Sequence, residues 1–207
     1  MSHPKFEKTL IIIKHDGVVR GIMGEIVQRF ERVGLKLVAM KMLSATEEMG
    51  HAHYPNSIEW LENVGKRSLN EYKEKGIDPI AKLGTDDAVE IGKMVKAWNV
   101  EYLTAGPVLA MIFEGPDAVK IGRKLVGSTV PMLAPPGTIR GDYSWDNADL
   151  ANALGRPFYN LIHASGDPAE ANQEIELWFD KQEIFDDYVL PHHGAMGLYG
   201  KLERKSS

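Results

Sequence analysis

The stretch TLIIIKHDGVVRGIMGEIVQRFERVGLKLVAMKML, residues 9–43, decides the fold, because a strand, a helix and a second strand follow one another in it. The β-branched run in 8–14 predicts a buried strand. Apolar side chains then recur at helical spacing over 21–32, with Gly34 ending the helix. Residues 35–43 alternate apolar and polar side chains, which is typical of a half-buried strand. The stretch therefore predicts one β-α-β unit.

A second unit of the same kind lies further along the chain. Residues 106–113 (GPVLAMIF) predict a buried strand, 117–126 an amphipathic helix, and 158–163 (FYNLIH) a fourth strand. Asp167 and the proline after it have the residue types of a helix start, and this helix is expected to run to about residue 179. Together the two units predict an α+β, ferredoxin-like split β-α-β fold, with a four-stranded antiparallel sheet covered by helices.

The other segments predict additions to this core. Thr46 opens a short helix, and the polar, helix-favouring residues 54–100 predict two or three surface helices. Residues 127–142 are dense in proline and glycine and predict a loop. The chain beyond residue 191 predicts a packed tail. Because no linker-like stretch interrupts the sequence, we expect residues 1–207 to form a single domain.

Composition and charge narrow the class of protein. The chain has 207 residues, of which 43% are hydrophobic and 26% charged, so it is an ordinary globular sequence. A net charge of −5 gives no general attraction to nucleic acid or to an anionic membrane. The absence of cysteine excludes disulfides, thiol nucleophiles and zinc–thiolate sites. With only a four-residue apolar run near its start, the sequence predicts a soluble, cytoplasmic protein.

His163 is the first candidate for chemistry. It ends the predicted fourth strand, directly before a helix start, in NLIHASGDP. There a histidine can offer one ring nitrogen for nucleophilic attack while a partner orients the other, and Glu174 in the following helix is a candidate partner. The alternative is a half-buried histidine with a structural role, and the residues alone leave both interpretations open.

Three cations stand at the ends of separate elements: Lys14, Arg123 and Arg140. Such groups could converge on a polyphosphate, although each could equally be a solvated surface cation. The loop PGTIRGD fixes the direction of Arg140 and favours the phosphate interpretation for it. Neither GxxxxGK[ST] nor GxGxxG is present, so a P-loop or Rossmann mechanism has no support.

Other polar and aromatic residues give weaker signals. The spacings of His51 with His53 and of the adjacent His192 and His193 do not suit a metal site, so no metal ligand is predicted. Three aromatic residues could stack on a base, but could equally belong to the core: Trp98, Tyr102 and Trp145.

Six blocks of the sequence together match one known family. They are KTLIIIKHDGVVRGIMGEIVQRFERVGLKLVAMKM at 8–42, HY at 53–54, AGPVLAMIFEG at 105–115, AVKIGRKLVGST at 118–129, PGTIRGDY at 136–143 and NLIHASGDPAEANQEIELWF at 160–179. These blocks fall in family order, and from the first to the last they span residues 8–179, well over half of the chain. The sequence resembles the nucleoside diphosphate kinases, and the resemblance implies the same ferredoxin-like core.

The resemblance also implies roles for individual residues. His163 corresponds to the nucleophile that takes up the phosphate, and Glu174 and Ser165 to the residues that position and polarise its ring. Lys14 and Tyr54 correspond to residues with both catalytic and nucleotide-binding roles. The nucleotide-binding residues implied are Lys14, Tyr54, Arg123, Thr129, Arg140 and Asn160. The family position that stacks on the base falls at Val95, near Trp98, and stays unassigned.

For the whole protein, the resemblance implies a ping-pong reaction. A nucleoside triphosphate such as ATP phosphorylates the histidine, its diphosphate leaves, and a second nucleoside diphosphate collects the phosphoryl group. Mg²⁺ rides on the phosphates without protein ligands. Members of the family are homo-oligomers, so a tetramer or hexamer is expected, with no membrane or nucleic acid as partner.

The sequence departs from the family pattern in four places. KHDG replaces KPDG, which puts His15 where the family has a proline, and HASGD replaces HGSD, which displaces Asp167 by one residue. Two insertions are expected relative to shorter members, at about 57–94 and 144–157. They leave open a second class of function, a nucleotide-binding module without turnover. RNA binding by the sheet has little support, because the stretches TLIIIK and YNLIH offer one aromatic residue and the net charge is negative.

Overall fold

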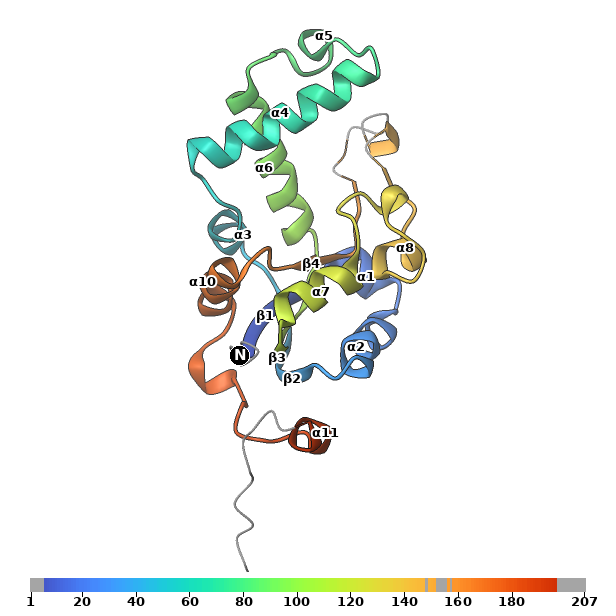
Figure 1. The fold of residues 1–207 in the computed structure, drawn as a ribbon. Coiled ribbons are helices and arrows are strands. Elements are labelled where there is room, and N and C mark those ends of the chain that lie inside the picture. Colours follow the sequence, from blue (N-terminus) through green and yellow to red (C-terminus); the bar gives the residue numbers. More distant parts are fainter. Residues whose placement is uncertain (1–5, 148, 152–155, 157, 197–207) are drawn as a thin grey trace, which may run out of the picture.

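A four-stranded antiparallel sheet lies at the centre of the computed structural model, in the order β2-β3-β1-β4 (Figure 1). The structure describes residues 6–147, 149–151, 156 and 158–196. The strands are β1 (Phe6–Ile13), β2 (Lys36–Ser44), β3 (Pro107–Pro116) and β4 (Ile162–Ala164). Each neighbouring pair is antiparallel. The predicted ferredoxin-like architecture is confirmed.

Helices follow the strands in the predicted order, with additional ones between β2 and β3 and after β3. They are α1 (His15–Val19), α2 (Met23–Arg32), α3 (Glu47–His53), α4 (Ile58–Glu74), α5 (Pro79–Leu83), α6 (Ala88–Thr104), α7 (Ala118–Val126), α8 (Ile139–Tyr143), α10 (Pro168–Trp178) and α11 (Pro191–Ala195), with 3₁₀ turns η1 (Pro131–Leu133) and η2 (Lys181–Glu183). Within the described residues, no helix is both long and apolar enough to span a bilayer.

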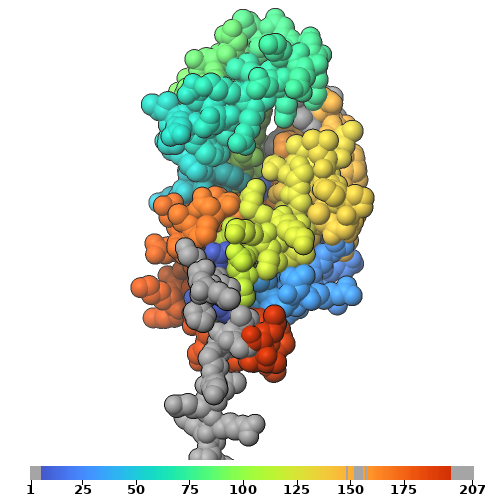
Figure 2. Space-filling model, in the orientation of Figure 1, coloured from blue at the N-terminus to red at the C-terminus, as the bar shows by residue number. Residues whose placement is uncertain are grey.

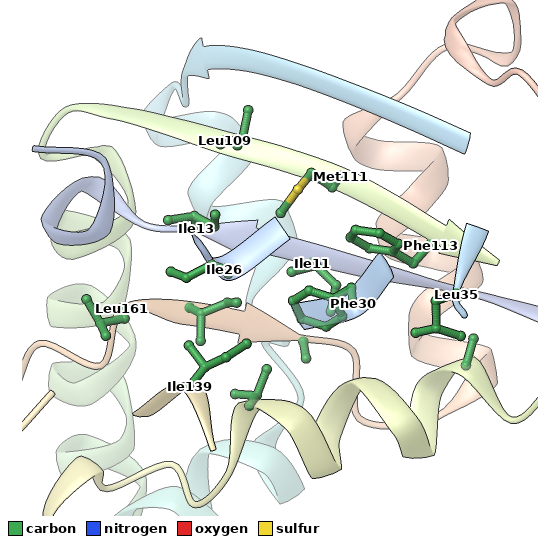
Figure 3. Close-up of a cluster of buried hydrophobic side chains, with 14 residues drawn as sticks. Ile11, Ile13, Ile26, Phe30, Leu35, Leu109, Met111, Phe113, Ile139 and Leu161 are labelled. Atoms are coloured by element: carbon green, nitrogen blue, oxygen red, sulfur yellow. The ribbon is translucent and has the colours of Figure 1, made fainter. Parts of the chain in front are cut away.

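The two faces of the sheet are buried by different helices. Ile11 and Ile13 pack on one face with α2 and α7, around the stacked rings of Phe30 and Phe113 (Figure 3). The intervening Ile12 points to the opposite face, where it packs with residues of α6 and α10. This alternation follows from the period of two along a strand. It also places the side chain of any residue paired with Ile12 on the α10 face.

The fourth strand is shorter than predicted, because 158–161 are not part of it. Leu161 has a φ of 64°, a left-handed conformation that breaks the extended run. Three bonds hold it there. Its carbonyl accepts the N–H of Lys14 at 2.7 Å, and its own N–H is shared between Asp16 Oδ2 and the Tyr102 hydroxyl, each at 3.2 Å. The prediction of a strand over 158–163 was therefore wrong for its first four residues, and the reason is a tertiary contact.

Two further segments differ from the sequence-based expectation. The predicted loop 127–142 contains η1 and leads into the short helix α8, which Thr138 caps by accepting the N–H of Gly141. In the predicted tail, α11 forms over Pro191–Ala195, and 197–207 lie outside the described residues. By contrast, the short helix at Thr46 and the helix start at Asp167 are confirmed, since both side chains accept N–H groups of their own first turn.

The helices between β2 and β3 form one end of the molecule, drawn in teal and green in Figures 1 and 2. α4 and α6 pack closely where two glycines face the partner backbone: a Cβ on Gly65 would lie 1.8 Å from the carbonyl oxygen of Ala88, and one on Gly92 would lie 2.1 Å from that of Leu61. The prediction of two or three helices over 54–100 is confirmed, with three helices present, although α6 is not only a surface helix because its Leu103 is buried in the core. The single domain and the insertions at 57–94 and 144–157 stay predictions, and residues 148, 152–155 and 157 of the second lie outside the described residues.

Candidate active site

His163 lies at the centre of the candidate site, and the sheet register determines which way it faces. It pairs with Ile12 on the neighbouring strand, so its side chain is on the α10 face. The side chain is 17% exposed, which leaves the ring accessible from one side. Its Nε2 lies 2.7 Å from Glu174 Oε1. Because that nitrogen faces the carboxylate, Nδ1 is the one available to a ligand.

Glu174 is fixed in turn by its own neighbours. Ser165, two residues after the histidine, donates its hydroxyl to Glu174 Oε2 at 2.6 Å. The same serine oxygen accepts the N–H of Leu10 at 3.0 Å, which connects the carboxylate to β1. Burial raises the pKa of Glu174, and contacts with His53 and Ser165 oppose that rise. The predicted trio of His163, Ser165 and Glu174 is therefore brought together.

The His163 ring is neutral at physiological pH. Burial, with the positive charges of Lys14, Arg140 and Arg123, lowers the pKa of His163 to about 3. A neutral imidazole keeps a lone pair on one nitrogen, which a nucleophile or a metal ligand requires. The cations that suppress protonation are also the groups that would attract phosphate oxygens.

Lys14 and Asn160 form the second part of the site. Lys14 Nζ donates to Asn160 Oδ1 at 3.0 Å and lies over the Tyr102 ring, 4.3 Å from its centroid. The Asn160 side chain also donates to the Thr129 carbonyl at 3.3 Å. Burial and the nearby Arg140 lower the pKa of Lys14 to about 7, against the opposing charge of Asp16. The ammonium therefore loses its proton far more readily than an exposed lysine.

Arg140 is buried, and its guanidinium group is largely occupied by backbone carbonyls. It donates to the carbonyls of Asn160 (3.0 Å), Gly127 (3.1 Å), Ser128 (3.2 Å) and Ile162 (2.5 Å). Four of the five N–H groups of this arginine are thus used to hold two backbone segments together, 127–128 and 160–162. Arg140 can therefore act on a ligand mainly through its positive charge, because few of its N–H groups are left to donate hydrogen bonds.

The remaining predicted residues lie at the edges of this group. Arg123 on α7 is exposed, and its charge acts on both His163 and Arg140. Thr129 is exposed and lines a cavity together with Asn160. Tyr54 follows α3 and lines a second cavity beside His163. Burial, together with the charge of Glu174, raises the pKa of Tyr54, so its hydroxyl stays protonated.

Sequence analysis missed two residues of the site. Tyr102, 3% exposed, cannot stack on a base; its hydroxyl instead accepts the N–H groups of Asn160 (3.0 Å) and Leu161 (3.2 Å). His53 is buried at the end of α3, and its ring lies 4.5 Å from that of His163. Neither carries a local sequence signal, because both reach the site through packing between distant segments. Trp145 is 73% exposed and lines neither cavity.

The departure at His15 has a visible structural basis. Its ring occupies the space in front of Gly106, where an added Cβ would lie 2.2 Å from His15 Nδ1. The backbone of Lys14 is held by its bond to the Leu161 carbonyl rather than by a following proline. The departure at Asp167 leaves that residue as the cap of α10, accepting from Ala169 and Glu170.

Two cavities meet this group of residues. The larger, about 460 Å³, lies between α4, α6 and residues 129–160, in the hollow between the teal and the yellow parts of Figure 2. Thr129 and Asn160 line it together with Val95 and Trp98. The smaller, about 420 Å³, borders His163 and has an acidic lining at the start of α10. Such volumes fall within the range of small-molecule sites.

Comparison with known proteins gives one consistent result. The family model described as nucleoside diphosphate kinase matches residues 7–61 and 89–184. A nucleoside diphosphate kinase of Pyrobaculum aerophilum is 53% identical over 180 residues, covering 87% of this chain and 98% of that protein.

Solved structures agree with this result. The crystal structure of an NDP kinase from Pyrobaculum aerophilum superposes with a TM-score of 0.86 at 52% identity, covering 88% of this chain and 100% of that one. A nucleoside diphosphate kinase from Borrelia burgdorferi, solved as a transition state mimic with bound vanadate and ADP, gives 0.71 at 35% identity, covering 91% and 96%. This chain belongs to the nucleoside diphosphate kinase family.

Proposed function

We propose that this protein is a nucleoside diphosphate kinase, which moves the terminal phosphate of a nucleoside triphosphate such as ATP to a nucleoside diphosphate through a phosphohistidine on His163. The observation that carries the proposal is the state of that ring: neutral, with a carboxylate 2.7 Å behind Nε2 and cations around it. A neutral nitrogen facing a cation-rich space suits attack on a phosphoryl group.

In the first half-reaction, the Nδ1 lone pair attacks the γ-phosphorus. The N–P bond forms as the bond from phosphorus to the bridging oxygen breaks, and the electron pair leaves on the diphosphate. The ring gains positive charge and keeps its proton on Nε2, where Glu174 Oε1 is within reach to stabilise it. A second diphosphate then attacks the phosphohistidine by the reverse path, which restores the neutral ring.

The cations hold and neutralise the phosphates. Lys14 is assigned to the transferring phosphate, Arg123 and Thr129 to the other phosphates, and Asn160 to the sugar. Arg140 contributes charge and fixes the loop, since its four carbonyl bonds leave one N–H group free. Preorganised positive charge of this kind supplies most of what phosphoryl transfer needs.

Tyr54 completes the set of contacts to the transferring phosphate. It borders the cavity next to His163, and its raised pKa keeps the hydroxyl as a donor. The larger cavity is assigned to the nucleoside, with Val95 and Trp98 along its wall.

Mg²⁺ would be carried on the nucleotide phosphates and would neutralise charge on the phosphoryl group during transfer. The residues around the phosphates fit a metal brought in this way. They are ammonium, guanidinium, hydroxyl and amide groups, and none of the predicted phosphate-binding residues is a carboxylate that could hold Mg²⁺ itself.

Self-association is part of the proposal. β2 is an edge strand, and its Met40 and Met42 are 45% and 54% exposed; Met132 and Leu133 of η1 are more exposed still. Apolar side chains on an open strand edge favour contact between copies of the chain, so we expect a homo-oligomer, tetrameric or hexameric. We place the protein in the cytoplasm, because a chain without cysteine forms no disulfides and gains nothing from an oxidising compartment.

The decisive test is transfer of label. Purified protein is incubated with Mg²⁺ and γ-labelled ATP, freed of nucleotide, and then given GDP. We expect an acid-labile, base-stable label on the protein that passes to GDP. Protein that binds ATP but takes no label would instead be a binding module, and the proposal would be wrong.

A further inference from the structure

Three buried polar atoms without a hydrogen-bond partner cluster beside the nucleophile. Among the described residues, six buried side-chain nitrogen or oxygen atoms lack a partner, and three of them are His53 Nε2, His163 Nε2 and Glu174 Oε1. Although His163 Nε2 and Glu174 Oε1 are 2.7 Å apart, they are not aligned for a hydrogen bond. Unsatisfied buried groups are costly, and an ion between His163 Nε2 and Glu174 Oε1 would satisfy those two atoms. His53 Nε2 carries the proton of its ring, so His53 could ligate only through Nδ1.

The three side chains have the composition of a transition-metal site. One ligand atom from each of His53, His163 and Glu174 lies within 4.8 Å of the others. Glu174 Oε1 lies 3.6 Å from His53 Nδ1 and 2.7 Å from His163 Nε2. The separation expected between ligands in a tetrahedral zinc site is about 3.3 Å, so His163 and Glu174 would move slightly apart to hold the ion. Two imidazoles with one carboxylate suit Zn²⁺ or Co²⁺, whereas Mg²⁺ prefers oxygen ligands.

The lone pair of the His53 ring is on Nδ1, because Trp178 Nε1 donates to that nitrogen at 3.3 Å. A cation at Nδ1 would take the place of this hydrogen bond. The smaller cavity borders all three side chains and gives an ion access from the α10 side.

We propose that His53, His163 and Glu174 form an inhibitory site for a transition-metal cation such as Zn²⁺, reached through the cavity of about 420 Å³ beside α10. A neutral imidazole has one nitrogen lone pair. If the cation binds the lone pair of His163 at Nε2, the ring proton must be on Nδ1. Nδ1 then has no lone pair with which to attack phosphorus. Bound cation and phosphoryl transfer therefore exclude each other. The site itself is independent of the proposed function, while its inhibitory effect rests on it.

Binding is tested with Co²⁺ alone, whose visible absorption reports its coordination. The variants are His53→Gln and His163→Gln, and the control is the double change of the exposed His51→Gln and His192→Gln. We expect one Co²⁺ per chain with intense tetrahedral bands, unchanged in the control. Either ligand variant should weaken binding by at least about 100-fold, beyond the 10–100-fold typical of outer-shell changes. The proposed site would be wrong if the tetrahedral bands were absent, or if Co²⁺ binding were weakened as much in the control as in the ligand variants. If His53→Gln does not fold, the comparison of His163→Gln with the control decides whether the site exists.

Inhibition is tested by loading the protein with one equivalent of Zn²⁺, removing the excess, and adding γ-labelled ATP with Mg²⁺ for a single turnover. We expect labelling of the wild type to fall at least tenfold, while folded His53→Gln treated in the same way keeps its own rate. Equal inhibition of both proteins would overturn the inhibitory role. Metal-free wild type that takes no label while still binding Co²⁺ would contradict the proposed function and leave the site standing.

Discussion

Replacing Glu174 by glutamine isolates the contribution of its charge to phosphoryl transfer. The change keeps the size of the side chain and leaves an oxygen for the Ser165 hydroxyl, which now donates to it at 2.6 Å. What is lost is the negative charge 2.7 Å from His163 Nε2, where positive charge grows as the N–P bond forms. The affected step is the formation of phosphohistidine.

The expected size of the effect follows from the type of contact. We expect Nε2–H to turn toward Glu174 Oε1 once the ring becomes positively charged, and a hydrogen bond to a charged group contributes about 1.5–3 kcal/mol. Because each 1.36 kcal/mol in the activation free energy changes a rate tenfold, phosphorylation should slow by about 10–150-fold. Nucleotide affinity should change little, since Glu174 lies behind the ring and away from the phosphates. The assay is a rapid-quench single turnover with labelled ATP, with affinity measured separately by titration.

The matched control is Glu176→Gln, which removes the same charge from an exposed position on the same helix. Its rate should stay close to that of the wild type. If Glu174→Gln slowed phosphorylation by less than about threefold, or no more than the control, the carboxylate would not be stabilising the charged ring. A matching loss of thermal stability and nucleotide affinity would instead assign Glu174 to folding.

Three other predictions concern the nucleophile, the site lysine and the helix pair. His163→Asn should abolish labelling while ATP still binds, as measured by calorimetry; residual transfer in a pure preparation would reject the nucleophile. Lys14, with a pKa near 7, is charged below that pH and neutral above it, so affinity for a non-hydrolysable ATP analogue should fall as the pH rises through 7. Binding near pH 8 should also take up a proton, which makes the heat measured by calorimetry depend on the buffer. An affinity that does not change with pH would contradict the assignment of Lys14 to the phosphates. Gly92→Ala should lower the free energy of unfolding, measured in urea, by about 1–3 kcal/mol, because the added Cβ would lie 2.1 Å from the Leu61 carbonyl oxygen. The control Gly24→Ala should not destabilise the protein, since nothing lies within 4 Å of its added Cβ.

Much of the fold could be predicted because its signals are local. Periodicity identifies the strands around Ile12 and Leu109, and capping residues mark the helix starts at Thr46 and Asp167. The shortening of β4 could not be predicted, because Leu161 adopts its left-handed conformation through bonds to segments far away in sequence. Local preference gave way there to tertiary contacts.

The candidate site divides in the same way. His163 and Glu174 share one short segment with recognisable spacing, and the family resemblance names them directly. His53 was assessed only against its neighbour His51 and set aside as a metal ligand, because spacing along one helix was the criterion. Its nearness to His163 depends on the sheet register and on the packing of α3 against α10, which the spacing does not encode. The same holds for Tyr102.

The pairing of β4 with β1 has a consequence for biosynthesis. Leu10 and Ser165 are 155 positions apart, yet their bond connects the nucleophile's strand to the first strand of the chain. A growing chain therefore exposes the edge of β1 until residues 162–164 have left the ribosome, and Glu174 must emerge later still. Non-local pairing of this kind makes folding slow and prone to aggregation. We infer that enzymatic competence arises only after the segment from β4 to Glu174 has emerged, and that the unpaired edge of β1 is where chaperones would act on nascent chains.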